Sequence, residues 1–321
     1  LGLSDSTAFR LNAMVERLDN HRDYYDGDRV GINPTLHFET ANSQIDLSYE
    51  YIDHQRFIDR GVPTGANGRP IEAFKDIVFG DPEVNTTELR ADLWRAALQY
   101  SFSESIKANI AAFHGDYDKL YQNFYTSGYS EASTPDQVTL DGYLDTTQRE
   151  NTILSAGLVS ESNWGDVEHT ILAGAEMIST TSNQDRYNSF WDTSLDDTEV
   201  FAIADRLSIR GGIGENIMGL RAANNFGVDI NDDTEVEIDV TSFYLQDEIA
   251  LTDSFRLVAG LRYDSFDIEV LNVVAAETRA RTDSEVSPRL GVVYKPEENI
   301  SVYASYSESF LPRSGEQFAN I

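Results

Sequence analysis

An alternation of apolar and polar residues over residues 236–311 constrains the fold of this chain more than any other feature. Phe255 and Leu257 occupy one set of alternate positions there, and Arg256 and Arg262 occupy the other. Side chains of a β-strand point to opposite faces in turn, so the pattern predicts strands with one apolar and one polar face.

The predicted strands are also long. Each runs for roughly 12 to 17 residues, whereas strands of globular proteins usually have about 5 to 6. Their connections differ in length, because residues 251–254 form a tight turn and residues 271–283 a longer polar loop. Long strands with tight turns at one end and larger loops at the other are typical of an outer-membrane barrel.

The same pattern recurs along the whole chain and predicts eleven strands. Seven lie at about 7–17, 29–39, 44–57, 87–102, 106–122, 146–161 and 167–182, and four lie within 236–311. Short turns at 40–43, 103–105, 162–166, 251–254 and 296–299 alternate with longer loops at 18–28, 58–86, 123–145, 183–235 and 271–283. We therefore predict an all-β fold, an antiparallel up-and-down transmembrane barrel segment with its short turns in the periplasm and its long loops outside. The short strands of sandwiches and propellers do not fit this pattern.

Eleven strands make an incomplete barrel. Single-chain bacterial barrels have an even number of strands, and an open edge in lipid leaves backbone groups unpaired at several kcal/mol each. We expect residues 1–321 to form one partial β-barrel domain of a larger chain.

Composition excludes several classes of protein. The chain has no Cys, so it can hold neither a disulfide nor a thiolate metal site. Its net charge of -31, from 24 basic and 55 acidic residues, argues against a nucleic-acid partner, because a phosphate backbone requires a basic surface.

No motif predicts an enzyme or a metal site. The five His residues are scattered without a zinc-binding spacing, and no G-x-S-x-G nucleophile motif occurs. The acidic run at 229–233 lacks the Gly and the Glu that an EF-hand loop needs at its sixth and twelfth positions. We predict no catalytic residue and no metal ligand.

Several segments resemble a known family in their order along the chain. They are STAFRLNAMVE, DGDRVGINPTLHFE, DRGVPTGANGRPI, FGDPEVNTTELRADLWRAALQYSFSES, GDYDKLYQNFY, HTILAGAEM, SFYLQDEIALTDSFRLVAGLRYDSFD and SPRLGVVYKPEENISVYASYSESFLP. Together they resemble the barrel of TonB-dependent siderophore receptors, of the ferrichrome and pyoverdine receptor type. The resemblance spans nearly the whole chain, and residues 183–235 match it least.

This resemblance implies a Gram-negative outer-membrane receptor for ferric siderophores. Its barrel would have about 22 strands around a plug domain, and this chain resembles the first half. The plug, the TonB box that binds the TonB–ExbB–ExbD complex, and the last strands are expected outside these residues. Outer-membrane lipid and lipopolysaccharide are the other expected partners. No resident cofactor is expected, because the iron stays inside its siderophore.

The resemblance also implies that aromatic and polar residues near the outer rim contact the ligand. By the predicted topology, the candidates are Tyr24, Tyr25, Tyr121, Phe124, Tyr125, Tyr187 and Trp191, with Arg60 and Arg69 for an anionic ligand. The alternative is that these side chains pack the outer loops against one another.

Other functions remain open on the sequence. A passive porin would share the strand pattern without a plug, and a related receptor would carry cobalamin or a sugar. A lipase barrel would need a paired Ser and His near the rim, and a large soluble β-protein would need no membrane.

Overall fold

The computed structural model describes residues 2–207 and 225–312. Their strands are β1 (Gly2–Ser4), β2 (Thr7–Asp19), β3 (Asp26–Glu39), β4 (Ser43–Phe57), β5 (Thr86–Ser101), β6 (Ile106–Ser130), β7 (Thr134–Trp164), β8 (Val167–Asn188), β9 (Thr198–Ala202), β10 (Asp229–Thr252), β11 (Phe255–Asn272), β12 (Glu277–Glu297) and β13 (Ile300–Ser307). Two short 3₁₀ helices, η1 (Glu72–Phe74) and η2 (Ile203–Asp205), lie between strands. No helix among the described residues has the length and apolar character to cross a membrane.

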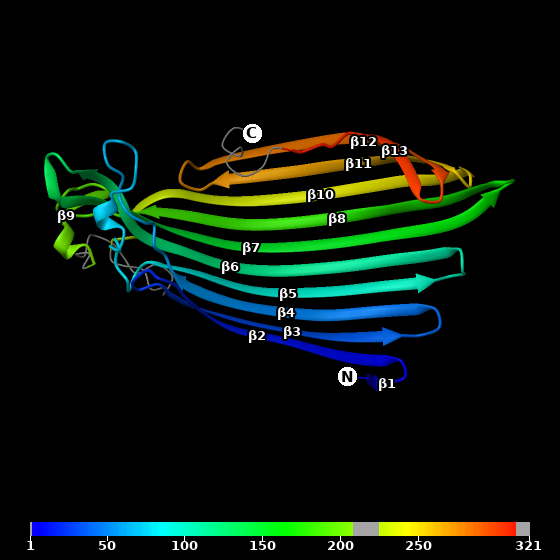
Figure 1. Cartoon of the computed structure of the whole chain (residues 1–321), viewed down its shortest axis with the longest axis horizontal. Helices are drawn as coiled ribbons and strands as arrows, with labels where there is room; N and C mark the ends of the chain where they lie inside the picture. Colours follow the sequence, from blue (N-terminus) through cyan, green and yellow to red (C-terminus); the bar gives the residue numbers. More distant parts are fainter. Residues whose placement is uncertain (1, 208–224, 313–321) are drawn as a thin grey trace.

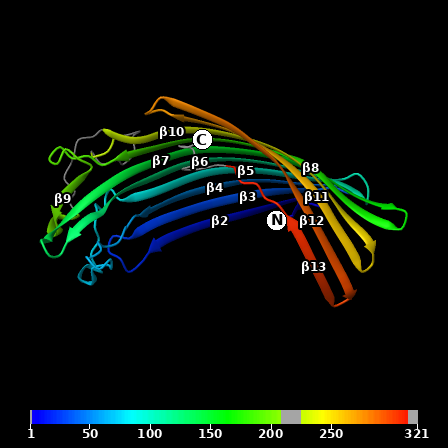
Figure 2. The ribbon, with the colours of Figure 1, turned by 90° about the horizontal axis from the view of Figure 1, so that it is seen from above.

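All thirteen strands belong to one antiparallel sheet in which consecutive strands are neighbours. The order is β1 to β8 and then β10 to β13, while β9 lies off this path and pairs with β7 (Figure 1). The sheet is curved, and its strands bend together along their length (Figure 2). The prediction of an all-β, antiparallel, up-and-down barrel segment is confirmed, and the eleven predicted strands correspond to β2–β8 and β10–β13.

The five predicted tight turns all lie at one end of the sheet, on the right in Figure 1. One of them joins β7 to β8 through Gly165 and Asp166, and Gly165 has φ +69°. That left-handed conformation suits glycine, which has no Cβ to clash with the following carbonyl.

The long loop predicted at 58–86 is confirmed, whereas two other predicted loops at the same end of the sheet are much shorter than expected. The segments at 123–145 and 271–283 are mostly strand, because β6 and β7 run to Ser130 and from Thr134, and β11 and β12 are separated by four residues. Gly, Ser, Thr and Pro make residues 123–145 resemble a loop. Backbone pairing with a neighbouring strand and cover from other segments outweigh those weak local preferences.

One face of the sheet is apolar across its width. Partnered residues form a row from β3 to β12: Phe38, Ile45, Leu98, Ile110, Ala156, Ala175, Phe243, Tyr263 and Val286. The adjacent row, shifted by one residue on every strand, lies on the opposite face. It consists of His37, Asp46, Ala97, Ala111, Ser155, Glu176, Ser242, Asp264 and Glu285. We call these the apolar face and the polar face. The predicted separation of the two kinds of residue is confirmed.

The apolar face has a limited height. On β10 it runs from Ile249 to Thr241, and Phe243 and Leu245 within it are more than half exposed. This length of about nine residues is what a tilted strand needs to cross the hydrocarbon of a bilayer. Towards the loops, carboxylates follow directly on the same face: Asp92, Asp116, Asp118, Glu150, Glu235 and Glu237. We call this set the acidic rows.

Asp247 is an exception within the apolar stretch of β10. Its carboxylate accepts a hydrogen bond from the His169 ring, with 2.7 Å between Oδ2 and Nδ1, and the ring of Trp164 lies 4.2 Å from that of His169. The ring of His169 thus satisfies one oxygen of this carboxylate, whereas the other oxygen, Oδ1, is buried without a hydrogen-bond partner among the described residues.

Beyond the acidic rows the apolar face becomes hydrophobic again and is covered by other segments. The buried residues are Phe79, Leu120, Phe124, Val138, Leu140, Leu144, Trp191, Phe201 and Phe226, which we call the loop core. It joins the β6–β7 hairpin to segment 58–85, to β9 and to the chain around Trp191, at the left end of Figure 1. The outer ends of β6 and β7 are therefore held by a hydrophobic core of their own.

Candidate functional site

Aromatic rings gather on the polar face of the β6–β7 hairpin, beyond the height of the acidic rows. Tyr121 and Tyr125 of β6 pair with Asp145 and Asp141 of β7, and Tyr143 lies between those two carboxylates. The alternation of β6 continues without a register shift from Ile106 to Thr126, so these tyrosines belong to the polar face. Local strand geometry alone thus sends their rings away from the loop core.

The three rings and two guanidinium groups are in contact, and we call Arg60, Tyr121, Tyr125, Tyr143 and Arg186 the tyrosine–arginine cluster. The rings of Tyr121 and Tyr143 stack with centroids 5.8 Å apart and planes 14° apart, and Tyr125 meets Tyr143 edge to face at 6.0 Å. Such stacked and edge-to-face arrangements are the preferred geometries of aromatic pairs.

Arg60 enters the cluster from segment 58–85. Its Nη1 donates a hydrogen bond to the Tyr143 hydroxyl at 2.5 Å, and its guanidinium carbon lies 4.8 Å from the centre of the Tyr125 ring. Arg186 of β8 lies over the other ring, 4.7 Å from the centre of Tyr143. A cation over a tyrosine ring is attracted by the negative face of that ring.

The two arginines differ in their carboxylate partners. Arg186 makes a bidentate pair with Asp145, at 2.6 and 2.7 Å, which balances its charge. The described contacts of Arg60 are with phenol groups and rings. The cluster therefore presents one cation whose partners are neutral, in a chain with 55 acidic residues.

Burial governs the protonation of the polar groups beside the cluster. The Tyr125 hydroxyl donates to Asp141 at 2.9 Å, and burial followed by this hydrogen bond raises the pKa of Tyr125 to about 12. Burial also raises the pKa of Asp141. Tyr125 consequently keeps its proton at any physiological pH and remains a hydrogen-bond donor.

Asn123 provides one more polar group at the centre of the hairpin. It lies opposite Tyr143 in the ladder, has no exposed surface, and donates from Nδ2 to the Tyr143 carbonyl at 3.3 Å. Its buried Oδ1 has no hydrogen-bond partner among the described residues. An unsatisfied buried acceptor is rare in folded proteins.

The structure brings three of the predicted ligand residues together: Arg60, Tyr121 and Tyr125. Phe124, Trp191 and Tyr187 belong to the other side of the hairpin, where Phe124 and Trp191 are fully buried in the loop core and Tyr187 packs against it. Phe124 stacks there on Phe226, with centroids 5.2 Å apart.

The remaining predicted ligand residues lie in turns. Tyr24, with φ +63° and half of its surface exposed, and Tyr25 lie in the turn between β2 and β3. Arg69 lies in a turn closed by a bridge between Thr64 and Pro70.

Sequence reasoning did not include Tyr143 and Arg186 in the cluster. Both fall in segments whose composition predicts loops, 123–145 and 183–235. The run Asp141, Tyr143, Asp145 against Leu140 and Leu144 alternates in the sequence, and it would have identified a strand with Tyr143 on its polar face.

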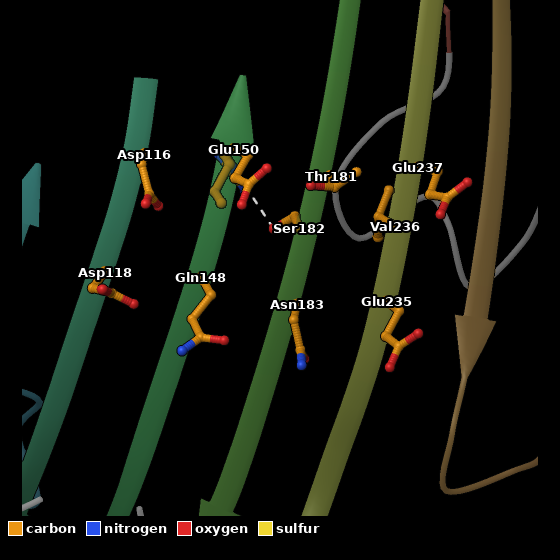
Figure 3. A pocket seen from close by; sticks show the side chains of 11 residues that line it. Asp116, Asp118, Gln148, Glu150, Thr181, Ser182, Asn183, Glu235, Val236 and Glu237 are labelled. Atoms are coloured by element: carbon orange, nitrogen blue, oxygen red, sulfur yellow. Dashed lines mark hydrogen bonds between the residues drawn. The ribbon is translucent and has the colours of Figure 1, made fainter. Parts of the chain in front are cut away.

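A hollow of about 440 Å³ lies on the apolar face at the acidic rows. Figure 3 shows Asp116 and Asp118 on β6, Glu150 on β7, and Glu235 and Glu237 on β10 around it. Among the residues that the structure describes, no group of three or more His, Asp or Glu side chains is arranged to hold a metal ion. The hollow is thus an acidic surface directly above the apolar stretch.

Comparison with known proteins agrees with this architecture. Residues 24–321 match the family model described as TonB dependent receptor-like, beta-barrel. The metal-pseudopaline receptor CntO of Pseudomonas aeruginosa is 24% identical over 97% of this chain and 42% of its own length.

Solved structures share the fold. The siderophore receptor PiuA from Acinetobacter baumannii superposes with a TM-score of 0.77 at 20% identity, over 95% of this chain and 45% of that one. The ferripyoverdine receptor of Pseudomonas aeruginosa superposes with a TM-score of 0.79 at 16% identity, over 98% of this chain and 40% of that one. The chain thus spans less than half the length of these proteins.

Proposed function

This chain belongs to the TonB-dependent receptor-like β-barrel family, and from that membership we propose that it is part of an outer-membrane receptor for ferric siderophores. The apolar face would contact lipid and lipopolysaccharide, and the polar face would line the lumen. The strand ends that carry the cluster would then open to the outside of a Gram-negative cell.

The observation that carries the proposal is the position of the tyrosine–arginine cluster. It lies on the polar face and beyond the apolar stretch, so a ligand arriving from outside would meet it before entering the lumen. Flat rings supply contact area at a small cost in conformational entropy, and tyrosine hydroxyls and guanidinium groups supply hydrogen-bond donors. Such a surface suits a chelate with exposed oxygen atoms.

We assign separate roles to the predicted ligand residues. Arg60, Tyr121 and Tyr125 would contact the ligand together with Tyr143 and Arg186. Tyr24, Tyr25 and Arg69 would offer contacts from the outer turns. Phe124, Tyr187 and Trp191 would act indirectly, because they pack the loop core that supports the hairpin.

The proposed activity is transport without covalent chemistry. The siderophore would keep its iron throughout, so the protein would need no metal ligands and no resident cofactor of its own. Energy would come from the TonB–ExbB–ExbD complex, through a TonB box and a plug outside these residues.

Ligand binding and uptake by the full-length receptor test the proposal. A strain without its own receptors would express the receptor and receive a panel of ferric siderophores, with cobalamin as a comparison ligand. We expect growth on at least one ferric siderophore, and a loss of affinity of about tenfold or more when Tyr121 and Tyr125 are both replaced by Ala, since each aromatic contact contributes about 1 kcal/mol. Uptake of cobalamin alone would contradict the proposal, and unchanged affinity of the double variant would remove Tyr121 and Tyr125 from the ligand contacts.

A further inference from the structure

Arg22, in the turn between β2 and β3, forms hydrogen bonds with the loop that carries Arg60. Its Nε donates to Asp59 Oδ2 at 2.5 Å, Nη1 donates to the Lys75 carbonyl, and Nη2 donates to the Ile77 carbonyl at 2.8 Å. The side chains of Arg22 and Asp59 are only 15% and 9% exposed, so solvent screens this ion pair weakly. One guanidinium thus links the β2–β3 turn to both ends of segment 58–77.

The Asp59 carboxylate has two partners. Oδ2 accepts from Arg22, and Oδ1 accepts from the backbone N–H of Gly61 at 2.9 Å. Gly61 has φ +84°, a conformation that favours glycine, so the chain bends sharply just after Arg60. The bend therefore depends on the orientation of the Asp59 side chain.

The Arg60 guanidinium has two kinds of possible partner, the Asp59 carboxylate and the phenols of the cluster. Asp59 is its neighbour in the chain, and an arginine forms a stronger charge-assisted bond with a carboxylate than with a neutral phenol. Arg60 nevertheless lies over Tyr125 and donates to Tyr143. Both oxygens of the neighbouring Asp59 carboxylate are meanwhile occupied, by Arg22 and by the Gly61 N–H.

We propose that Arg22 is a positioning residue: by neutralising Asp59, it keeps Arg60 directed at the tyrosines and available to the ligand. The inference rests on the proposed function, because it assumes that the ligand binds at the cluster. It adds that a residue outside the cluster, in the first outer turn, controls the cation that the cluster presents.

The experiment measures the affinity of the full-length receptor for its best ferric siderophore by quenching of intrinsic fluorescence. Four variants are compared: R60A, R22A, D59N and R22A/D59N. The matched control is R206A, because Arg206 also fastens segment 58–85, through a bond from Nε to the Val78 carbonyl at 2.9 Å, but does not contact Asp59. Resistance of the folded barrel to unfolding by detergent and heat verifies that each variant is folded.

We expect R60A and R22A each to weaken binding by about tenfold, the effect of losing one charged hydrogen bond. The double variant R22A/D59N should bind within about twofold of wild type, because asparagine still accepts from Gly61 but cannot capture Arg60 as an ion pair. D59N alone and R206A should also remain within about twofold, because neither variant leaves an unpaired carboxylate beside Arg60.

The possible failures are distinct. Unchanged binding by R60A would overturn the assignment of the ligand to the cluster, and the present inference with it. If R60A weakens binding while R22A does not, the positioning role of Arg22 alone is wrong. If R22A/D59N binds as weakly as R22A, or if R206A matches R22A, then Arg22 merely stabilises the loop and the inference is overturned.

Discussion

The phenol ring of Tyr244 lies across Gly174, its partner on the neighbouring strand, on the polar face of the sheet. Gly157, the next residue in the same row, borders the Tyr244 hydroxyl, and the Arg262 guanidinium lies 5.9 Å from the centre of the ring. A glycine in a strand exposes its backbone, and an aromatic ring on the adjacent strand can cover it. The pair is thus a packing unit in which the small residue makes room for the large one.

Substitution of Gly174 by Ala should destabilise the barrel, because the added Cβ would overlap the Tyr244 ring. Overpacking of this kind typically costs about 1–3 kcal/mol. The measurement is the unfolding free energy of the full-length receptor in detergent. Gly291→Ala is the matched control, since its Cβ would meet its nearest neighbour, Val258, at an ordinary 3.5 Å. Equal stability of the two variants would contradict this account of the packing.

The two faces predict opposite responses to charge at adjacent positions of β10. Leu245 lies on the apolar face and is 56% exposed, whereas Gln246 lies on the polar face. Leu245→Arg should cost about 2–4 kcal/mol of folding free energy in a bilayer, and Gln246→Arg should cost much less. Folding into phospholipid vesicles, followed by the mobility shift of folded barrels in gels, measures both. A larger penalty for the Gln246 variant would reverse the assignment of the faces.

Asn85 should be required for the attachment of segment 58–85 to β6. It is 2% exposed, donates to the carbonyls of Ile58 and Phe124 at 3.1 and 2.9 Å, and accepts from the Phe124 N–H at 2.8 Å. Its side chain thus pairs with β6 as a neighbouring strand would. Asn85→Ala leaves these backbone groups unpaired, at about 1–3 kcal/mol each.

Faster proteolysis within residues 58–85 would reveal this loss in the Asn85→Ala variant. Asn67→Ala provides the comparison, because Asn67 is exposed and accepts only from the N–H of Arg69 within its own turn. The proposed attachment would be wrong if both variants were cleaved at the wild-type rate.

The stability of the outer hairpin should fall as the pH rises. Burial raises the pKa of Asp141, so the folded hairpin holds this proton more tightly than the unfolded chain does. Stability is therefore lost as the pH rises from the ordinary carboxyl pKa through the raised value. Asp141→Asn should remove the cost of burying the charge, although its single amide oxygen can replace only one of the two carboxylate oxygens, which accept from the Tyr125 hydroxyl and the Gly142 N–H.

Hydrogen exchange of residues 123–145 in the receptor tests this dependence, after correction for intrinsic rates. Asp141→Asn should be better protected than wild type at pH 7, and the difference should shrink below pH of about 4. Asp136→Asn, an exposed position of the same hairpin, is the control. Lower protection of the Asp141 variant at both pH values would show that the carboxylate stabilises the hairpin.

Strand periodicity was sufficient to predict most of the fold. Alternation located eleven strands and their tight turns, since each strand has faces of opposite polarity. The strand content of residues 123–145 was underestimated, because their Gly, Ser, Thr and Pro resemble a loop and the segments that cover their buried side, β9 and 58–85, are distant in sequence.

The cluster was only partly predictable for a related reason. Tyr121 and Tyr125 follow from their position on a long strand, whereas their contact with Arg60 depends on how segment 58–85 folds over the hairpin. Phe124 stands beside Tyr125 in the sequence and yet belongs to the loop core. The alternation of β6, when it is extended beyond residue 122 to Tyr125, places the two residues on opposite faces.

The extension of β6 and β7 as a paired ladder has a consequence for how such a protein can evolve. Odd-numbered positions from Tyr121 to Tyr125 lie on the polar face, and even-numbered positions from Leu120 to Phe124 lie on the side of the loop core. If the proposed function holds, mutations in the first set would change ligand contacts and leave the packing of the second set intact. A lineage would then acquire a new nutrient one side chain at a time, without rebuilding its surface loops.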